Sequence, residues 1–231
     1  LLPQEDAVLY VDSDVIFVRP VEDLWNYFDD MNDQQLALMI SDVEDMPLNP
    51  YYNRTAMPRY GLYGLNSGVM LMNLTRMRDF GMEALLVALM DKHRPEALPF
   101  PDQDILNMAF HDHPDKLLQG HCRWNFMHVT CWSRTACEGE TPALVHGTYK
   151  TFTDLTRAKG MRVIGQAMQQ YRLGTSLERN FVDVLEENLR DAGTSLCSDK
   201  VRSFVRHWRQ LARTLDAERG WKTTDVLASR T

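Results

Sequence analysis

The chain has 231 residues, of which 44% are hydrophobic and 25% charged, so it can bury a full core as an ordinary globular protein does. Its formal net charge of −7 argues against a general binder of nucleic acid or anionic membranes, because such proteins need a basic surface. No apolar run approaches the roughly 20 residues that span a bilayer, and no signal peptide is visible. The chain begins with Leu1 and enters an apolar run almost at once, so we expect an upstream part that could carry a leader or an anchor.

Apolar runs of strand length occur at 7–11, 36–40, 68–72 and 143–146. Helical periodicity covers 75–92, with Thr75 as a possible N-cap, and 102–110. Strands that alternate with helices favour an α/β layered fold. From about Leu177 the pattern changes to two amphipathic helical segments separated by a turn, which we interpret as a helical appendage.

The stretch "AVLYVDSDVIFVRP" places Asp12 and Asp14 directly after the run at 7–11. That run is apolar throughout and therefore indicates a strand covered on both faces. Carboxylates at such a position cost free energy unless a metal, a lysine or water pairs with them. Mg²⁺ and Mn²⁺ prefer oxygen ligands and leave positions open for phosphate oxygens. A metal site and a solvated turn both remain open from these residues alone.

A second polar group, Asn66, Ser67 and Gly68, leads into the run at 68–72. Glycine permits close approach of the backbone to a ligand, and an asparagine side chain offers both a donor and an acceptor. The alternative is a plain turn before a core strand.

A third group, Asp102, Gln103 and Asp104, follows Pro101 at the expected helix start. N-capping explains one acidic residue there, but it does not explain the whole cluster. The sequence therefore leaves a capping role and a binding role open.

The fourth group is His146, Gly147 and Lys150, which ends the run at 143–146. An imidazole could complete a Mn²⁺ site, and a lysine ammonium could neutralise diphosphate oxygens. A lone histidine is more often structural, so this group gains weight only beside the carboxylates of Asp12 and Asp14.

The four cysteines are Cys122, Cys131, Cys137 and Cys197. They form no CxxC pair and accompany no histidine pair at zinc-finger spacing, which argues against structural zinc. The even number is compatible with two disulfides, and Cys131 and Cys137 are close enough in sequence to close a short loop. Two glycosylation sequons, at Asn53 and Asn73, also favour the secretory pathway.

In combination and in order, the DxD, NSGV, DQDILN and HGxxK segments resemble the glycogenin-like family of retaining GT-A glycosyltransferases, glycosyltransferase family 8. Within it, "LYVDSDVIFVRPVEDLW", "NSGVMLMNLTRMR" and "CRWNF" are most similar to the glucoside xylosyltransferases. The resemblance covers residues 3 to about 170. It implies a GT-A, Rossmann-like fold with a mixed sheet flanked by helices. The first βα units of that fold precede the DxD segment in the family and are missing from this chain. We therefore expect residues 1–175 to be the C-terminal part of a GT-A catalytic domain and 176–231 to be a helical appendage.

The resemblance also implies a role for each polar group. The metal ligands for Mn²⁺ or Mg²⁺ would be Asp12, Asp14 and His146, and the residues in contact with the UDP-sugar donor would be Ser13, Asn66, Ser67, Gly68, Gly147 and Lys150. Asp102 and Gln103 would lie beside the anomeric carbon as catalytic residues. The spacing from His146 to Lys150 is shorter than in the glycogenin-like relatives, which leaves the lysine's role less secure.

The implied activity is transfer of xylose in α-linkage from a UDP-sugar to O-linked glucose on a glycoprotein, such as an EGF-type repeat. The implied partners are the donor and this acceptor, with no nucleic acid, and the implied location is the Golgi or ER lumen. The parent protein would reach a membrane only through an anchor outside this chain, as in a type II membrane protein. Two alternatives stay open, namely a glucosyl or galactosyl transferase of the same family and a non-catalytic binding module. Because the first βα units are missing, we expect weak or no activity from these 231 residues alone.

Overall fold

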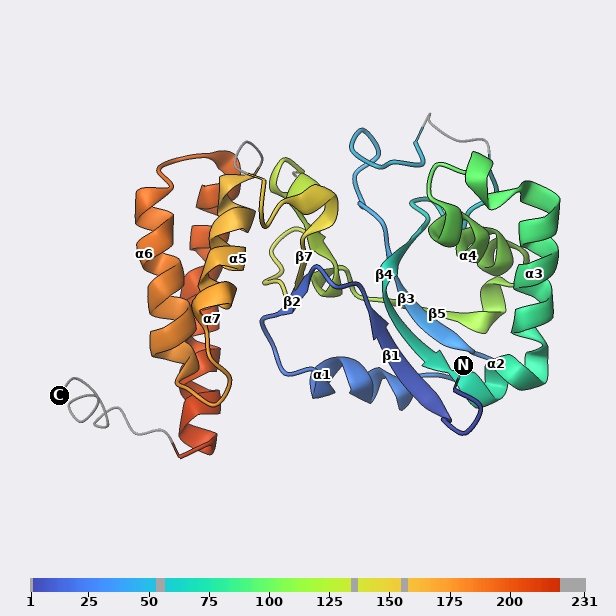
Figure 1. The fold of residues 1–231 in the computed structure, drawn as a ribbon, viewed down its shortest axis with the longest axis horizontal. Helices are drawn as coiled ribbons and strands as arrows, with labels where there is room; N and C mark the ends of the chain where they lie inside the picture. Colours follow the sequence, from blue (N-terminus) through green and yellow to red (C-terminus); the bar gives the residue numbers. More distant parts are fainter. Residues whose placement is uncertain (1, 53–56, 134–136, 155–157, 221–231) are drawn as a thin grey trace. The chain divides into compact units, whose positions relative to one another are not determined.

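The computed structural model describes residues 2–52, 57–133, 137–154 and 158–220 (Figure 1). The chain divides into two compact units, 1–146 and 147–231. The described part of the first unit contains seven strands, β1 (Ala7–Val11), β2 (Val15–Phe17), β3 (Ala37–Ser41), β4 (Leu65–Asn73), β5 (Leu117–Gly120), β6 (Phe126–Met127) and β7 (Leu144–His146). They form a four-stranded sheet in the order β1-β4-β3-β5 and a three-stranded sheet in the order β2-β7-β6.

Both sheets are mixed. Strand β4 is antiparallel to β1 and β3, β5 is parallel to β3, and β7 is antiparallel to β2 and parallel to β6. The α-helices of this unit are α1 (Glu22–Trp25), α2 (Leu74–Phe80), α3 (Met82–His93) and α4 (Pro101–Asp112). Short 3₁₀ turns lie at η1 (Asn26–Phe28), η2 (Pro95–Ala97), η3 (Pro114–Lys116), η4 (Cys122–Trp124) and η5 (His128–Cys131). The predicted α/β class, with a mixed sheet flanked by helices, is confirmed.

Strand β3 separates two hydrophobic cores, because successive side chains of a strand point to opposite faces. Ala37 and Met39 pack into one core with residues of α3 and α4, which Figure 1 shows beside the sheet. Leu38 and Ile40 pack into the other core with α1 and the fully buried Trp124. Burial on both faces explains why the run at 36–40 is apolar throughout rather than alternating.

An irregularity in β4 separates the two halves of this strand. Met39 of β3 pairs with Met70, but the next residue, Ile40, pairs with Asn66. The β4 residues between Asn66 and Met70 therefore leave the ladder with β3, as in a β-bulge, which redirects side chains. Ser67 and Gly68 of the NSG segment lie in this irregular part, next to the site described below.

The predicted helix at 75–92 is two helices, α2 and α3, because Gly81 adopts a left-handed conformation with φ 79° and ends the first. The predicted N-cap at Thr75 is wrong. Asn73 is the cap, and its side-chain oxygen accepts a hydrogen bond from the Arg76 N–H at 3.0 Å. One of the two sequons therefore begins with a capping residue, and the other, at Asn53, lies outside the described residues.

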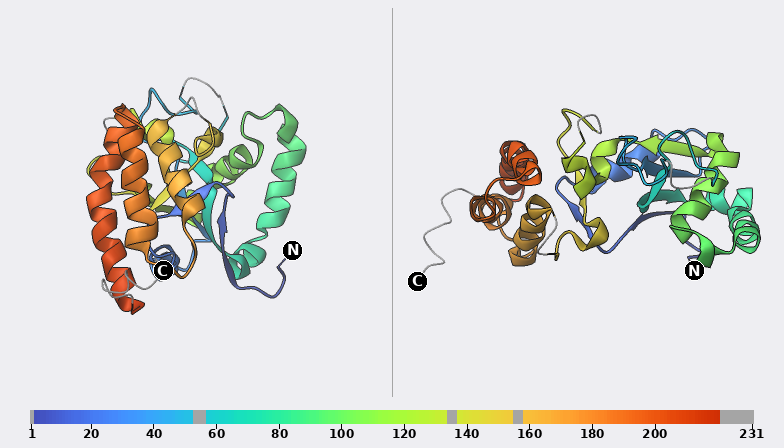
Figure 2. Two further views of the ribbon diagram at one scale, coloured as in Figure 1. Left: turned by 60° about the vertical axis from the view of Figure 1, so that its left-hand side comes forward. Right: turned by 90° about the horizontal axis from the view of Figure 1, so that it is seen from above.

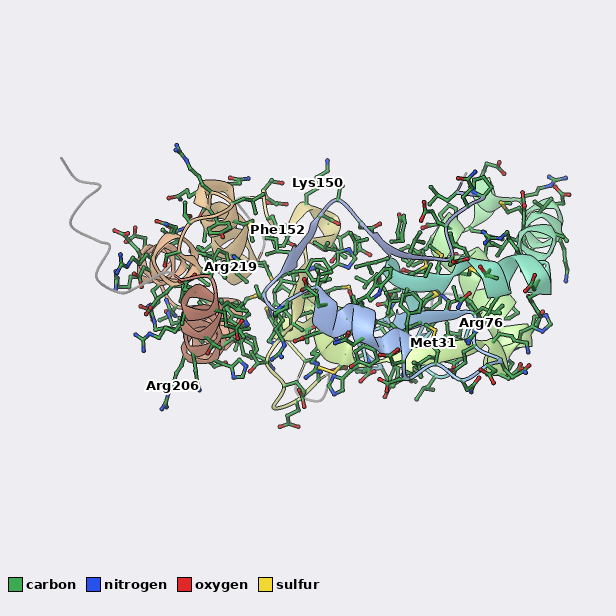
Figure 3. All side chains as sticks on the ribbon, turned by 90° about the horizontal axis from the view of Figure 1, so that it is seen from below. Met31, Arg76, Lys150, Phe152, Arg206 and Arg219 are labelled. Atoms are coloured by element: carbon green, nitrogen blue, oxygen red, sulfur yellow. A yellow bond between two sulfur atoms is a disulfide. The ribbon has the colours of Figure 1, made fainter. Side chains whose placement is uncertain are left out.

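The second unit contains the turn η6 (Thr148–Lys150), α5 (Lys159–Gln170), the π-helical turn η7 (Glu178–Asp183), α6 (Val184–Asp191) and α7 (Leu196–Glu218). Helices α5, α6 and α7 lie side by side (Figure 2). Gly160 lets α5 approach the backbone of α7 closely, since a Cβ at Gly160 would lie 2.5 Å from the Cys197 carbonyl oxygen. A Cβ at Gly165 would lie 2.8 Å from that of Phe152, which Figure 3 labels.

Helix α5 thus belongs to the same compact unit as α6 and α7, and the unit begins at Gly147. The appendage predicted from the sequence begins at 176, because the change of pattern near Leu177 was the only boundary signal. The buried carboxylate of Asp216 in α7 accepts hydrogen bonds from the Leu177 and Glu178 N–H groups at 2.8 and 3.0 Å. This contact ties the start of η7 to α7.

A disulfide joins Cys122 and Cys137, whose Cα atoms are 5.7 Å apart, within the usual range for such a bond. The short loop that Cys131 and Cys137 could close is therefore not formed by a disulfide between them, because proximity in sequence does not decide which thiols meet in space. None of the described helices combines the length and the apolarity that crossing a membrane requires.

Candidate metal centre and donor site

Asp12, Asp14 and His146 meet because of the strand pairing around them. The two aspartates lie in the turn between β1 and β2, and the first residue of β2, Val15, pairs with His146 at the end of β7. The Nε2 atom of His146 lies 3.5 Å from Asp12 Oδ2 and 3.4 Å from Asp14 Oδ1. The fold thus brings together ligand atoms of residues that are more than 130 positions apart in the chain.

The donor set fits a divalent cation. The three ligand atoms all lie within 4.8 Å of one another, and two ligands at right angles, each about 2.1 Å from a cation, are separated by roughly 3 Å. Burial lowers the pKa of His146, although Asp12 and Asp14 act in the opposite direction. The neutral imidazole that a metal needs is therefore favoured. Two carboxylates with one imidazole suit Mn²⁺ or Mg²⁺ better than a thiolate-seeking metal.

Asn125 orients the imidazole. Its Nδ2 atom donates to the Ser41 carbonyl at 3.3 Å, so its Oδ1 atom faces His146 Nδ1 at 2.9 Å. An amide oxygen only accepts hydrogen bonds, and Nδ1 therefore carries the proton in the neutral ring. The lone pair is then left on Nε2, which faces Asp12 and Asp14, as the hydrogen-bond partners of ligating histidines commonly arrange.

Gly68 packs directly against this centre. A Cβ atom on Gly68 would overlap the His146 ring at Cε1 and would lie 2.8 Å from Asp12 Oδ2. The Gly68 carbonyl also accepts the Asp12 N–H at 2.9 Å, which fixes the start of the DxD turn. The glycine of the predicted NSG group is thus required by space at the centre, in addition to any contact with a ligand.

A second polar cluster adjoins the metal centre through the same segment. Asn66 accepts the Gly68 N–H at 3.1 Å and donates to Gln103 Oε1 at 3.1 Å. The Ser67 N–H also donates to Gln103 Oε1 at 3.1 Å, and the Ser67 hydroxyl donates to Asp102 Oδ2 at 3.0 Å. The structure therefore brings the predicted NSG and Asp-Gln groups together, because α4 packs against β4.

The two predicted catalytic residues differ in availability. Gln103 is 7% exposed, and its oxygen already accepts two hydrogen bonds. Asp102 is exposed at the start of α4 and accepts the one bond from Ser67. Of the two, Asp102 presents the more accessible oxygen to a molecule bound at this cluster.

The remaining predicted donor contacts are Ser13, Gly147 and Lys150. Ser13 is exposed between the two aspartates. Gly147 and Lys150 begin the second compact unit, where Tyr149 and Lys150 both adopt left-handed backbone conformations, with φ 59° and 62°. The Lys150 side chain is exposed and extends away from its own turn (Figure 3). Their contacts with a diphosphate stay a prediction.

Sequence reasoning missed several polar residues that hold the site together. These are Asp42, Tyr51, Asn107 and Asn125, all of them buried. Asp42 follows β3, so the rule that placed Asp12 at the end of a strand could have found it. Asn107 and Asn125 lie within the DQDILN and CRWNF segments, but the pattern gives them no role, and nothing in it marks Tyr51, because the roles of all three depend on partners far away in the chain.

Asp42 makes stability depend on pH. Burial raises its pKa to about 6, although hydrogen bonds from the Val43 N–H, Asn66 and Gln103 act in the opposite direction. The folded state thus binds the proton more tightly than the unfolded chain, where aspartate titrates near about 4. Its contribution is complete below about pH 4 and is lost as the pH rises through about 6.

We expect the free energy of unfolding of the wild type to fall by up to about 3 kcal/mol from pH 4 to pH 7 relative to Asp42→Asn. Urea unfolding of both proteins at each pH measures this difference. Parallel pH profiles for the two proteins would contradict it.

The family model of glycosyl transferase family 8 matches residues 1–152, a segment that contains all three residues of the candidate metal centre. The chain belongs to glycosyl transferase family 8. The match ends just after the HGxxK group, so α5, α6 and α7 lie outside the part that defines the family.

Among curated family 8 relatives, glucoside xylosyltransferase 1 of Gallus gallus is 30% identical over 95% of this chain and 53% of its own length. The proteins of the same name from Rattus norvegicus and Homo sapiens are 33% and 31% identical, over 93% of this chain and 52% and 51% of their lengths. The chain thus spans about half the length of the curated relatives that it matches.

Two solved structures are similar in part. Mouse xyloside xylosyltransferase 1, in its apo form, has a TM-score of 0.46 at 24% identity, over 64% of this chain and 59% of the other. The galactosyltransferase LgtC in complex with donor and acceptor sugar analogues has a TM-score of 0.45 at 19% identity, over 80% of this chain and 62% of the other.

Proposed function

We propose that the protein transfers xylose, in α-linkage, from UDP-xylose to an O-linked glucose on a glycoprotein, with Mn²⁺ held by Asp12, Asp14 and His146. The observation that carries the proposal is the convergence of these three side chains in a chain that belongs to glycosyl transferase family 8. The choice of xylose rests on the names of the relatives, which are glucoside xylosyltransferases.

The proposed chemistry assigns a task to each polar group. A divalent cation at the centre would hold the diphosphate and stabilise the negative charge that develops on the leaving UDP. Asn66, Ser67 and Gln103 would line the sugar pocket. The exposed carboxylate of Asp102 would face the anomeric carbon, where an oxocarbenium-like charge develops. Retention through a covalent intermediate and retention through front-face attack are both compatible with this placement.

The proposed location is the secretory pathway, in the Golgi or ER lumen. The disulfide between Cys122 and Cys137 supports it, because such bonds persist in oxidising compartments and are rare in the cytosol. The proposed acceptor is a glycoprotein that carries O-linked glucose, such as an EGF-type repeat, which enters that pathway too. The acidic net charge of −7 is consistent with a protein that does not bind nucleic acid.

Calorimetric titration of the whole protein with UDP-xylose and UDP-glucose, first with Mn²⁺ and then with EDTA, tests the proposal. We expect binding that requires Mn²⁺ and favours UDP-xylose, and release of UDP when a glucose-bearing acceptor is added. Preference for UDP-glucose, or for UDP-galactose in a third titration, would replace the sugar but keep the transferase. Absence of binding to every donor would support the non-catalytic module instead. The same titration of the 231-residue chain tests the expectation that this part alone is weakly active or inactive.

A further inference from the structure

Tyr51 lies outside every motif, yet its hydroxyl group is the centre of the polar cluster beside the proposed donor site. The side chain is 1% exposed and follows β3 in a long connection to β4. Its hydroxyl donates to Asp104 Oδ1 at 2.9 Å and accepts hydrogen bonds from Gln103 Nε2 at 3.0 Å and Asn107 Nδ2 at 3.1 Å. Three residues of α4 thus converge on one oxygen atom.

The direction of each hydrogen bond is determined by groups that can act in only one way. The Ser67 N–H can only donate, so the Gln103 oxygen faces Ser67 and its NH₂ group faces Tyr51 and Asp42. The Leu65 N–H likewise donates to Asn107 Oδ1 at 2.7 Å, which turns the Asn107 NH₂ group towards Tyr51. With two NH₂ groups pointing at its oxygen, the Tyr51 hydroxyl must donate its own hydrogen bond to Asp104.

The Asp104 carboxylate is suited to accept that hydrogen bond. Its other oxygen, Oδ2, accepts the Phe100 N–H at 3.0 Å, and the side chain is 1% exposed. Both oxygens are therefore used inside the protein, which leaves this carboxylate a structural partner of Tyr51 rather than a group facing a ligand. Burial also raises the pKa of Tyr51, so the hydroxyl keeps its proton at physiological pH.

Gly64 holds the tyrosine ring in place. A Cβ atom on Gly64 would lie 2.7 Å from Tyr51 Cδ2, so only glycine lets the backbone approach the ring this closely. Gly64 also has φ 69°, a left-handed conformation that glycine adopts without strain. The ring therefore packs against backbone and its hydroxyl has little freedom to move away from Gln103.

We propose that Tyr51 is a positioning residue that orients the carboxamide of Gln103, and through it Asn66 and Ser67, at the pocket for the donor sugar. The role in sugar binding rests on the proposed function above, whereas the orientation of Gln103 does not. Removing the hydroxyl would take from the Gln103 NH₂ group one of its two acceptors, leaving Asp42. With Asp42 as the remaining acceptor, the amide would turn away from Ser67 more readily than in the wild type.

Two variants test this inference. Tyr51→Phe removes the hydroxyl. Asp104→Asn keeps the volume, but its new carboxamide must turn its oxygen to the Phe100 N–H, so its NH₂ group faces Tyr51. Three donors would then surround the hydroxyl oxygen, and its own proton would have to point at Gln103 or Asn107. Tyr27→Phe is the matched control, since Tyr27 is half-buried against the other core, with Leu24 and Trp124.

The first measurement is the side-chain NH₂ resonance pair of Gln103 in the ¹⁵N-glutamine-labelled 231-residue chain, assigned by its absence in Gln103→Ala. We expect the pair to shift and to exchange faster with water in Tyr51→Phe and Asp104→Asn, and to stay in place in Tyr27→Phe. Circular dichroism identifies a variant that does not fold, in which case the other variant decides. An unchanged pair in the folded variants would overturn the inference.

The second measurement is calorimetric binding of UDP-xylose and of UDP, with Mn²⁺, to the whole protein carrying the same substitutions. We expect each variant to bind UDP-xylose roughly 5- to 20-fold more weakly and UDP unchanged, because only the sugar end is affected. Equal weakening for both ligands, or none, would overturn the role at the sugar pocket. If the wild type binds neither ligand, the proposed function fails, and the NMR result still decides the orientation of Gln103.

Discussion

Asp14→Ala is expected to weaken Mn²⁺ binding by roughly 100-fold or more, because loss of a side chain that touches the metal costs at least as much as loss of a residue that hydrogen-bonds to a ligand, which costs roughly 10- to 100-fold. Asp14 Oδ1 lies 3.4 Å from His146 Nε2 and is one of three ligand atoms at the centre. Two ligands, Asp12 and His146, do not enclose a cation. Electron paramagnetic resonance of free Mn²⁺, titrated with protein, measures the affinity directly.

The unfolding temperature of Asp14→Ala shows whether the variant has lost only a metal ligand or has also lost its fold. Without metal, removal of one of two adjacent carboxylates relieves repulsion, so we expect an unfolding temperature at least equal to that of the wild type. The wild type, unlike the variant, should gain stability on addition of Mn²⁺. Asp112→Ala is the matched control, since Asp112 is exposed and ends α4, about 15 Å along the helix from Asp102. Unchanged Mn²⁺ affinity in Asp14→Ala would place the metal elsewhere.

Gly68→Ala is expected to damage the metal centre and to destabilise the first unit by about 1–3 kcal/mol, the usual effect of adding a methyl group to a well-packed site. The added Cβ would overlap the His146 ring and crowd Asp12 Oδ2. His146 is 2% exposed and held by Asn125, so its ring cannot move aside without breaking that bond. Urea unfolding and Mn²⁺ titration measure the two effects.

The double variant with His146→Ala is the control for this prediction. With the imidazole gone, most of the overlap disappears, so adding Gly68→Ala should cost much less free energy than it does in the wild type. The difference between the two backgrounds is the coupling energy of the two positions. If Gly68→Ala costs the same in both backgrounds, its effect does not act through the His146 ring.

Much of the metal centre could be predicted from sequence because its residues lie at strand ends. Asp12 and Asp14 follow an apolar run that is recognisable as a buried strand, and His146 ends another. The hydrogen bond between Gln103 and Asn66 could not be predicted in this way. Their contact depends on how α4 packs against β4, and the distance between them along the chain carries no signal of it.

The local chemistry of this chain determined the buried strands, the amphipathic helices and the polar groups at their ends, since each is encoded in the residues of one short segment. The tertiary structure alone decided that Cys122 pairs with Cys137, that α5 packs with α6 and α7, and that Tyr51 joins α4 to the polar cluster. The reason is physical. Hydrogen bonds, disulfides and steric overlap depend on separations of a few ångströms in space, and those separations are set only when the sheets and helices have packed.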